Sequence, residues 1–166
     1  IAMEHAGEHP PLDLDAYVER GGFAALQKCL AEKTPEAVID EVKRSGLRGR
    51  GGAGFPTGAK WGMARAAAGT PKYVICNGDE GDPGAFMDRM LLESFPFRVL
   101  EGIAIAAYAV GAQEGVLYVR AEYPYAVERI RRAIALCEER GLFDLKPEAT
   151  ANGSAAEPFR LRLRVM

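Results

Sequence analysis

The sequence predicts an α/β fold, with a Rossmann-like parallel sheet and flanking helices. Three runs over 73–76, 115–120 and 159–166 are β-branched, aromatic or strictly alternating, and turn residues bound them, which favours strands. Segments with helical periodicity separate these runs. Strands that alternate with helices pair in parallel, and the helices pack on the sheet. We therefore expect an α/β domain over 46–166, preceded by a helical segment over 1–45.

The segment before the first strand is predicted to be helical. Apolar residues recur at helical spacing over 13–19 and 23–30, which indicates two short helices. Thr34 followed by Pro35 marks the start of a third helix, because threonine caps helix N-termini and proline is tolerated in the first turn. An Ala-rich segment over 60–68 predicts a fourth helix.

After the first strand the chain is predicted to continue as helix, helix, strand, helix and strand. The three helices are expected over 85–94, 96–111 and 124–141, where proline and glycine mark several of the ends. Residues 149–158 are predicted to form a flexible loop. The final run, F-R-L-R-L-R-V-M over 159–166, alternates strictly and predicts a half-buried strand with its arginines on one face.

The composition excludes several classes of protein. The 166 residues have a net charge of −2, which argues against a dedicated nucleic-acid binder. No apolar run approaches the roughly 20 residues that a membrane helix needs, and no secretory signal pattern is visible. The three cysteines are widely spaced, which fits reduced thiols in the cytoplasm and excludes a locally encoded iron–sulfur site.

A glycine-rich loop over 45–61 is the most informative stretch of the sequence. It contains six of the nineteen glycines, interleaved with Arg48, Arg50 and Lys60. Backbone N–H groups flanked by cations form an anion cradle, for which phosphate is the usual ligand. Residues 49–54 match the G-x-G-x-x-G pattern, but that fingerprint must follow a strand, and a helix is expected here. The loop is therefore predicted to bind an anion without being a dinucleotide fingerprint.

An acidic loop, N-G-D-E-G-D-P-G over 77–84, directly follows the first strand. In open α/β sheets, ligands bind outside the carboxyl ends of the strands. Carboxylates and an amide suit sugar or ribityl hydroxyls, so the two loops together fit a phosphate joined to a polyol and a heteroaromatic ring, as in FMN. A divalent-metal site made by Asp79, Glu80 and Asp82 is the alternative, although the EF-hand spacing is not met.

Two long motifs, S-G-L-R-G-R-G-G-A-G-F-P-T-G-A-K-W and Y-V-I-C-N-G-D-E-G-D-P-G-A-F-M-D-R, resemble the family of NADH-binding FMN flavoprotein subunits. This family includes the complex I flavoprotein subunit and the diaphorase subunits of soluble NAD-linked hydrogenases and formate dehydrogenases. The resemblance implies an FMN-dependent NAD(P)H oxidoreductase that passes electrons between NAD(H) and iron–sulfur clusters. It also implies a 4Fe–4S cluster in the parent chain, outside this segment.

The resemblance further implies partners and site residues. The partners are iron–sulfur subunits of a multisubunit oxidoreductase, with no nucleic acid and no direct membrane insertion, in the cytoplasm or at the cytoplasmic face of a membrane. Phe55 would stack on the adenine of NAD(H), and Asp82 would lie near the nicotinamide. The flavin would mediate hydride transfer, so neither a catalytic side chain nor a metal ligand is implied. The FMN contacts would come from Gly49, Arg50, Gly51, Gly52, Lys60, Asn77, Asp79 and Glu80.

The sequence departs from the family pattern at three points. Asp82 stands where the complex I branch usually has glutamate. Met63 stands where many relatives have an aromatic residue beside the adenine, and the Gly-Glu-Glu turn that completes the family's site would come after Met166. The α/β domain is therefore expected to be incomplete at its C-terminus. The alternatives are an isolated fold fragment with neither tight FMN binding nor turnover, and a sugar-phosphate or metal-binding enzyme. The choice between NAD and NADP, and between hydrogenase, formate dehydrogenase and respiratory complex, stays open.

Overall fold

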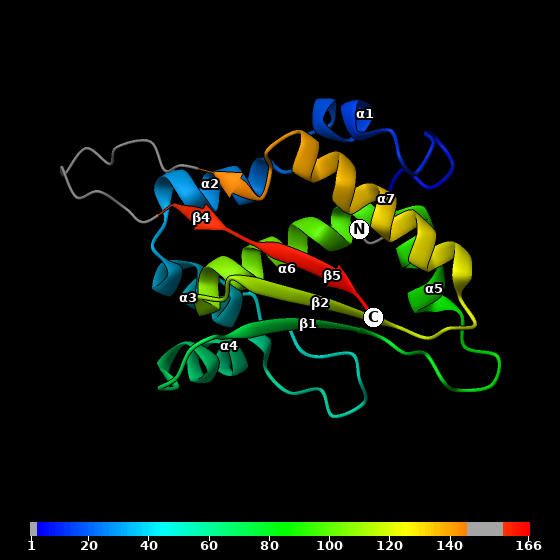
Figure 1. Cartoon of the computed structure of the whole chain (residues 1–166). Helices are drawn as coiled ribbons and strands as arrows, with labels where there is room; N and C mark the ends of the chain where they lie inside the picture. Colours follow the sequence, from blue (N-terminus) through cyan, green and yellow to red (C-terminus); the bar gives the residue numbers. More distant parts are fainter. Residues whose placement is uncertain (1–2, 146–157) are drawn as a thin grey trace.

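The computed structural model describes residues 3–145 and 158–166, so most of the loop predicted over 149–158 lies outside the described residues. The helices are α1 (Leu14–Glu19), α2 (Ala24–Glu32), α3 (Pro35–Arg44), α4 (Thr57–Ala66), α5 (Met87–Ser94), α6 (Pro96–Val110) and α7 (Pro124–Glu139). The strands are β1 (Tyr73–Gly78), β2 (Glu114–Val119), β3 (Asp144–Leu145), β4 (Phe159–Arg160) and β5 (Arg162–Val165). The arrangement is shown in Figure 1.

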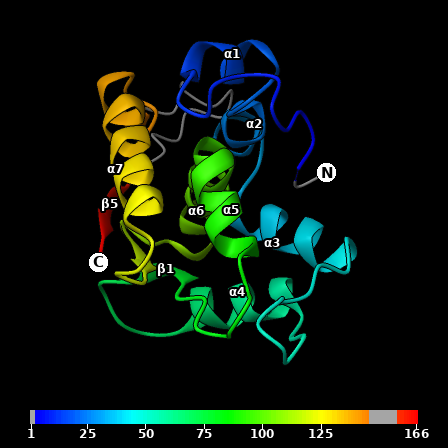
Figure 2. The ribbon, with the colours of Figure 1, turned by 90° about the vertical axis from the view of Figure 1, so that its right-hand side faces the viewer.

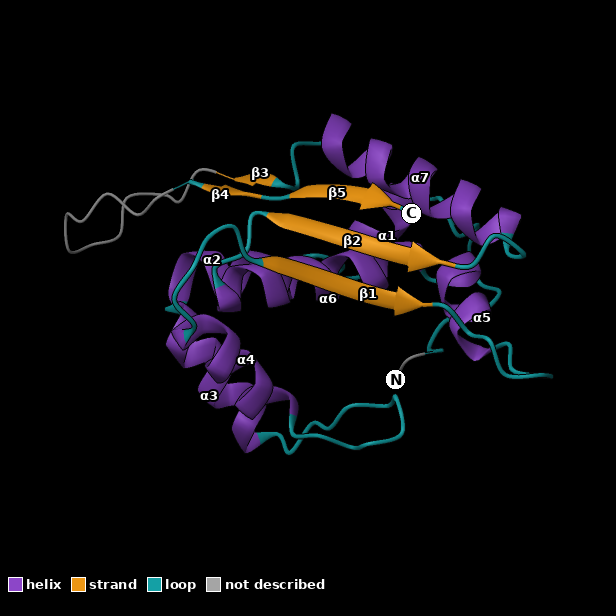
Figure 3. Ribbon diagram, turned by 60° about the horizontal axis from the view of Figure 1, so that its bottom comes forward, coloured by secondary structure: helices purple, strands orange, loops and turns teal. Residues whose placement is uncertain are grey.

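A parallel three-stranded sheet forms the frame of the molecule, with strand order β1-β2-β5. In its register Ile75 lies opposite Val116, and Val116 lies opposite Arg164. Helices α5 and α6 connect β1 to β2, and α7 follows β2. Figure 3 shows the three strands running in one direction, so their carboxyl ends lie at the same end of the sheet. The predicted α/β fold with a parallel sheet and flanking helices is therefore confirmed.

Helix α6 lies at the centre of the core. Its Ala-, Ile- and Leu-rich sequence is apolar around most of its circumference, which is typical of a helix surrounded by protein. Pro96 begins the helix, and Gly111 ends it with a φ of 79°, as the sequence predicted. In Figure 2, α6 lies between the sheet and the N-terminal helices.

The sheet is covered by helices on one face only within the described residues. The covered side chains, which pack on the core, are Val74, Cys76, Leu117, Val119, Leu163 and Val165. On the opposite face Tyr73, Ile75 and Tyr118 are exposed, with 66% of Ile75 accessible. Parallel sheets usually have both faces covered. The arginines of β5 lie on this open face, as the strict alternation of the last run predicted.

Helix α4 begins at Thr57, three residues before the predicted start at Lys60. Sequence alone assigned Gly58 to the loop, but this glycine allows α3 and α4 to approach closely. A Cβ atom at Gly58 would lie 2.6 Å from the backbone nitrogen of Lys43. A packing requirement between two helices thus explains a glycine that resembled a loop residue, and it places Lys60 in the first turns of α4.

Two strands also differ from the prediction. β1 runs to Gly78 rather than Cys76, because β2 pairs with it as far as Val119. The final run divides at Leu161 into β4 and β5, where the Leu161 N–H donates to the carbonyl of Phe143. β4 pairs antiparallel with β3, whereas β5 joins the main sheet. Both differences depend on partner strands that are distant in sequence.

The carboxylate of Glu101 joins the N-terminal helices to α6. Its oxygens accept hydrogen bonds from the Tyr17 hydroxyl at 2.6 Å, the Phe23 N–H at 2.9 Å and the Leu26 N–H at 3.3 Å. Phe23 occupies the N-cap position of α2 in a left-handed conformation, with φ of 62°, and has no capping side chain. Glu101 satisfies backbone donors that the helix start itself leaves open.

Candidate functional site

The glycine-rich loop between α3 and α4 is closed at its base like a hairpin. The Gly49 N–H donates to the Phe55 carbonyl at 2.9 Å, and the Thr57 N–H donates to the Leu47 carbonyl at 2.9 Å. Arg48 and Pro56 form an antiparallel bridge beside these bonds. The loop is therefore a defined structure whose tip extends from the helices, as Figure 1 shows in cyan.

The glycines at the tip of this loop fall into two groups, those that the backbone conformation requires and those that it does not. Gly52 and Gly54 have positive φ values of 96° and 60°, which disfavour any other residue. Gly51 has no positive φ, and a Cβ atom there would meet nothing within 4 Å. At Gly49 a Cβ would meet only backbone atoms of Phe55, at 3.7 Å or more. Neither conformation nor packing requires Gly49 and Gly51. The Gly49 N–H already donates to the Phe55 carbonyl, whereas the Gly51 N–H makes no backbone hydrogen bond within the described residues and is open to a ligand.

Three exposed cations accompany this backbone. Within residues 3–145 and 158–166, Arg48, Arg50 and Lys60 have no ion-pair partner, whereas Lys43 on the neighbouring helix pairs with Asp40 at 3.0 Å. Arg50 donates only to the carbonyl of Arg48, at 3.0 Å. Unpaired cations beside accessible N–H groups favour a bound anion, and phosphate fits both sets of donors.

The acidic loop begins where β1 ends. The side-chain oxygen of Asn77 accepts the N–H of Asp79 at 3.0 Å, which forms a local turn and leaves the amide NH₂ for other partners. The Ala85 N–H donates to the carbonyl of Asp82 at 3.1 Å. The carboxylates of Asp79 and Asp82 are exposed at the carboxyl end of the sheet, where ligands of α/β folds bind.

Glu80 faces the protein rather than the solvent. Its carboxylate accepts the backbone N–H groups of Asp88 at 3.0 Å and Arg89 at 3.2 Å, and thereby caps α5, whose own N-cap Phe86 has no capping side chain. Burial raises the pKa of Glu80, but these hydrogen bonds outweigh it and hold the pKa below its usual value. The Tyr123 hydroxyl lies 3.4 Å from the same carboxylate.

Two side chains beside this loop were missed from the sequence. Arg120 donates to the Glu80 carbonyl at 2.6 Å, and the Tyr123 hydroxyl lies 3.3 Å from the carbonyl of Ala85. Both follow β2, the strand beside β1. The signal available in the sequence was their position after a neighbouring parallel strand, since the carboxyl ends of such strands meet at one end of the sheet.

The structure places the two loops on the same side of the molecule but does not join them. Figures 1 and 3 show both beside the β1 edge, with the glycine-rich loop next to α4 and the acidic loop between β1 and α5. No hydrogen bond or ion pair links them within the described residues. The exposed ring of Phe55 belongs to the first loop and Asp82 to the second.

The alternative of a metal site receives no support from the described residues. Among residues 3–145 and 158–166, no group of three or more His, Cys, Asp or Glu side chains is arranged to hold a metal ion. Of the three carboxylates considered, Glu80 is turned toward α5. Burial raises the pKa of Cys76 to about 11 and that of Cys137 to about 12, so these thiols stay protonated at neutral pH.

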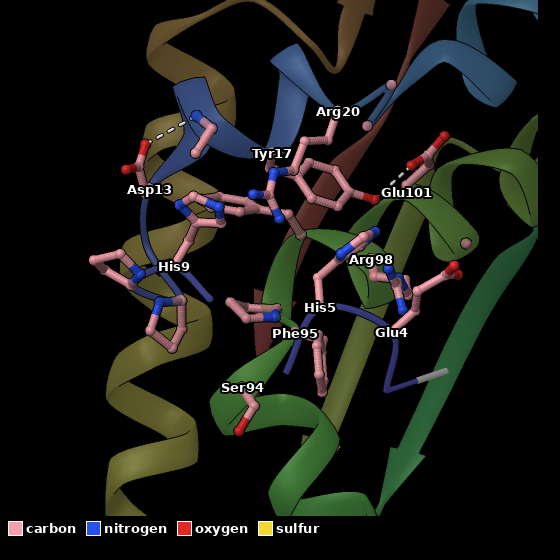
Figure 4. Close-up of a pocket in the computed structure, with 18 of the residues that line it drawn as sticks. Glu4, His5, His9, Asp13, Tyr17, Arg20, Ser94, Phe95, Arg98 and Glu101 are labelled. Atoms are coloured by element: carbon pink, nitrogen blue, oxygen red, sulfur yellow. Dashed lines mark hydrogen bonds between the residues drawn. The ribbon is translucent and has the colours of Figure 1, made fainter. Parts of the chain in front are cut away.

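A cavity of about 730 Å³ lies elsewhere, between the N-terminal segment and α6. Figure 4 shows the Tyr17 hydroxyl pointing to Glu101 in this cavity. Arg20, also in its lining, pairs with Glu8 at 2.7 Å. These polar groups therefore satisfy one another, and no residue of either loop lines the cavity.

Within the described residues, no helix is long and apolar enough to cross a membrane.

The fold and the two loops define an α/β domain with a candidate anion-binding hairpin and an acidic loop near the carboxyl ends of a parallel sheet. Residues 42–161 match the Nuo51 FMN-binding domain. The chain therefore belongs to the Nuo51 FMN-binding domain family, which confirms the resemblance drawn from the two sequence motifs.

Individual relatives agree with this assignment. The chain is 51% identical over 128 residues to a subunit of NADH-quinone oxidoreductase from Rhizobium meliloti, covering 77% of this chain and 30% of that protein. It is 51% identical over 142 residues to NADP-reducing hydrogenase subunit HndC of Solidesulfovibrio fructosivorans, covering 86% and 29%. The crystal structure of an H₂-reduced NAD⁺-reducing [NiFe]-hydrogenase matches with a TM-score of 0.69 and 35% identity, over 95% of this chain and 25% of that chain. The chain thus spans 30% or less of the length of each of these relatives.

Proposed function

We propose that this chain is part of an FMN-dependent NAD(P)H oxidoreductase, a diaphorase-type subunit that passes electrons between NAD(H) and iron–sulfur clusters. The observation that carries the proposal is the glycine hairpin, where Gly51 leaves the main chain open beside three cations that have no ion-pair partner within the described residues. A phosphate-bearing ligand accounts for both features. Membership of an FMN-binding family identifies that ligand as FMN.

The residues of the two loops would divide the work of binding. FMN supplies the chemistry, since a flavin exchanges a hydride with a nicotinamide and passes electrons singly to other centres. The backbone of Gly49, Gly51 and Gly52 would approach the phosphate and the ring, while Arg50 and Lys60 would stabilise negative charge. On the acidic loop, Asn77, Asp79 and Glu80 would contact the ribityl group and ring atoms of the same ligand.

The dinucleotide would bind over the outer parts of both loops. The exposed ring of Phe55 is suited to stacking on an adenine, and the exposed carboxylate of Asp82 to contacts near a nicotinamide. We further infer that residues 1–45 are a helical segment and 46–166 the FMN- and NADH-binding domain. The whole polypeptide would assemble in the cytoplasm with iron–sulfur subunits, because the relatives are subunits of NADH-quinone oxidoreductases and NAD(P)-reducing hydrogenases.

The test is a fluorescence titration of FMN with the purified 166-residue chain and with the longest natural polypeptide that contains it. We expect saturable quenching of flavin fluorescence in both. Quenching by the longer polypeptide alone would support the function and would assign part of the flavin affinity to the additional residues. If neither protein quenches FMN fluorescence, the proposal is wrong.

Lys60→Ala is expected to weaken FMN binding about tenfold without unfolding the protein, because Lys60 is an exposed, unpaired cation in the first turns of α4. Lys28→Ala is the matched control, since Lys28 is likewise exposed but lies on α2, away from both loops. The dissociation constant of FMN and the urea midpoint are measured for both. Equal FMN affinities in the two variants would remove Lys60 from the site.

A further inference from the structure

Tyr123 and Arg120, in the connection between β2 and α7, both contact Glu80 in the acidic loop, and Tyr123 also contacts Ala85, directly after the loop. The Tyr123 hydroxyl lies 3.4 Å from the carbonyl and carboxylate oxygens of Glu80 and 3.3 Å from the carbonyl of Ala85. Because a phenol has one proton to donate, these acceptors share it. Arg120 adds a shorter hydrogen bond to the Glu80 carbonyl, at 2.6 Å. We call Arg120 and Tyr123 the loop clamp.

The loop clamp is itself held from several sides. Two guanidinium groups lie over the Tyr123 ring, that of Arg89 at 5.5 Å and that of Arg120 at 5.4 Å from its centroid. Arg89 pairs with Glu93 at 2.9 Å, and Arg120 pairs with Glu122 at 3.2 Å. Cation–π contacts and ion pairs together fix the ring. The clamp thus joins the start of α5, the start of α7 and the acidic loop.

The segment between Glu80 and Ala85 carries Asp82. It runs from Gly81 to Gly84, both exposed, and Gly84 has a φ of 80°. The Gly81 N–H donates to the Asp79 carbonyl and the Ala85 N–H to the Asp82 carbonyl, both at 3.1 Å, but these local bonds do not fix the segment relative to the sheet. Its position relative to the sheet is set where it is attached, at Glu80 and Ala85, and Tyr123 reaches both of these attachment points.

We propose that Tyr123, supported by Arg120, is a positioning residue that presents Asp82 to the dinucleotide, and this inference rests on the proposed function. Neither side chain is expected to touch the reacting atoms. The Tyr123 hydroxyl reaches Glu80 and Ala85 on either side of the segment that carries Asp82, and within the described residues no hydrogen bond joins it to the glycine hairpin that would hold the flavin phosphate. Loss of the hydroxyl should therefore weaken binding of the dinucleotide and leave FMN in place, because the backbone N–H groups of Asp88 and Arg89 and the side chain of Arg120 still hold Glu80.

The experiment compares Tyr123→Phe with Tyr125→Phe in the full-length polypeptide. Phenylalanine keeps the ring and its cation–π contacts, so only the hydroxyl is removed. Tyr125 is the matched control, because it lies two residues away, is 67% exposed and makes no hydrogen bond within the described residues. The measurements are amide hydrogen exchange at residues 81–85, the KM and kcat for NADH with an artificial electron acceptor, and the dissociation constant of FMN.

For Tyr123→Phe we expect exchange at residues 81–85 to rise about fivefold and the KM for NADH to rise about fivefold, as loss of one hydrogen bond implies. We expect kcat and FMN affinity to stay within about twofold of the wild-type values. Tyr125→Phe should match the wild type throughout. Unchanged exchange in Tyr123→Phe, or an unchanged KM for NADH in active enzyme, would overturn the inference. A wild-type polypeptide that binds FMN but never oxidises NADH would instead contradict the proposed function.

Discussion

Replacing Glu101 by alanine is expected to lower the free energy of unfolding by about 3 kcal/mol. The substitution would leave the Tyr17 hydroxyl and the N–H groups of Phe23 and Leu26 without an acceptor at the buried junction between the N-terminal helices and α6. An unsatisfied buried donor costs about 1–3 kcal/mol, and access of water through the adjoining cavity reduces the sum for three of them. The loss is large against a typical domain stability of about 5–15 kcal/mol.

Urea denaturation of the 166-residue chain, followed by far-ultraviolet circular dichroism, measures this loss. Glu101→Gln keeps an acceptor oxygen and should lose about half as much stability. Glu128→Ala, at an exposed position of α7, is the control and should change stability by no more than about 0.5 kcal/mol. A Glu101→Ala variant as stable as Glu128→Ala would show that the carboxylate does not anchor the N-terminal helices.

Much of the fold could be predicted because its signals are local. Thr34 caps α3 through the N–H of Ala37, as its position before Pro35 indicated. The apolar alternation of the last run indicated the exposed face of β5. Each of these features depends on residues within a few positions of one another, and capping or periodicity is visible in a single sequence.

The features that escaped prediction depend on contacts between residues far apart in the sequence. The division of the last strand at Leu161 depends on Phe143, and the extension of β1 to Gly78 depends on β2. Two helix caps have no local signature: Glu101 caps α2 from 78 residues away, and Glu80 caps α5 from eight residues before Asp88, outside the usual N-cap position.

The candidate site shows the same division. The two loops were singled out from composition and position, whereas the individual roles of Gly51 and Asp82 came from the family resemblance and stay predictions. The role of Glu80 in capping α5 was hidden, because a glutamate in an acidic loop gives no indication of which way its carboxylate turns. Arg120 and Tyr123 were missed because they bind backbone carbonyl groups of the loop, and such contacts require no particular partner residue.

Gly51→Ala is expected to raise the dissociation constant of FMN about tenfold or more while stability stays within about 0.5 kcal/mol of the wild type. A Cβ at this position meets no protein atom within 4 Å, so the folded chain accepts it, but it would occupy the space through which a ligand approaches the main chain. Overpacking a close contact costs about 1–3 kcal/mol, and about 1.4 kcal/mol of binding free energy is a factor of ten.

Gly58→Ala should show the opposite pattern, with a lower free energy of unfolding and little change in the dissociation constant of FMN. Its Cβ would lie 2.6 Å from the Lys43 backbone nitrogen, so α3 and α4 must separate, and the free energy of unfolding should fall by about 1–3 kcal/mol. FMN titration and urea denaturation of both variants compare FMN affinity and stability between a glycine of the loop and a glycine at the start of α4. If Gly51→Ala kept full FMN affinity, or lost stability as Gly58→Ala does, the hairpin backbone would not be a ligand surface. The glycines of this loop would then serve only to let the chain turn between two packed helices.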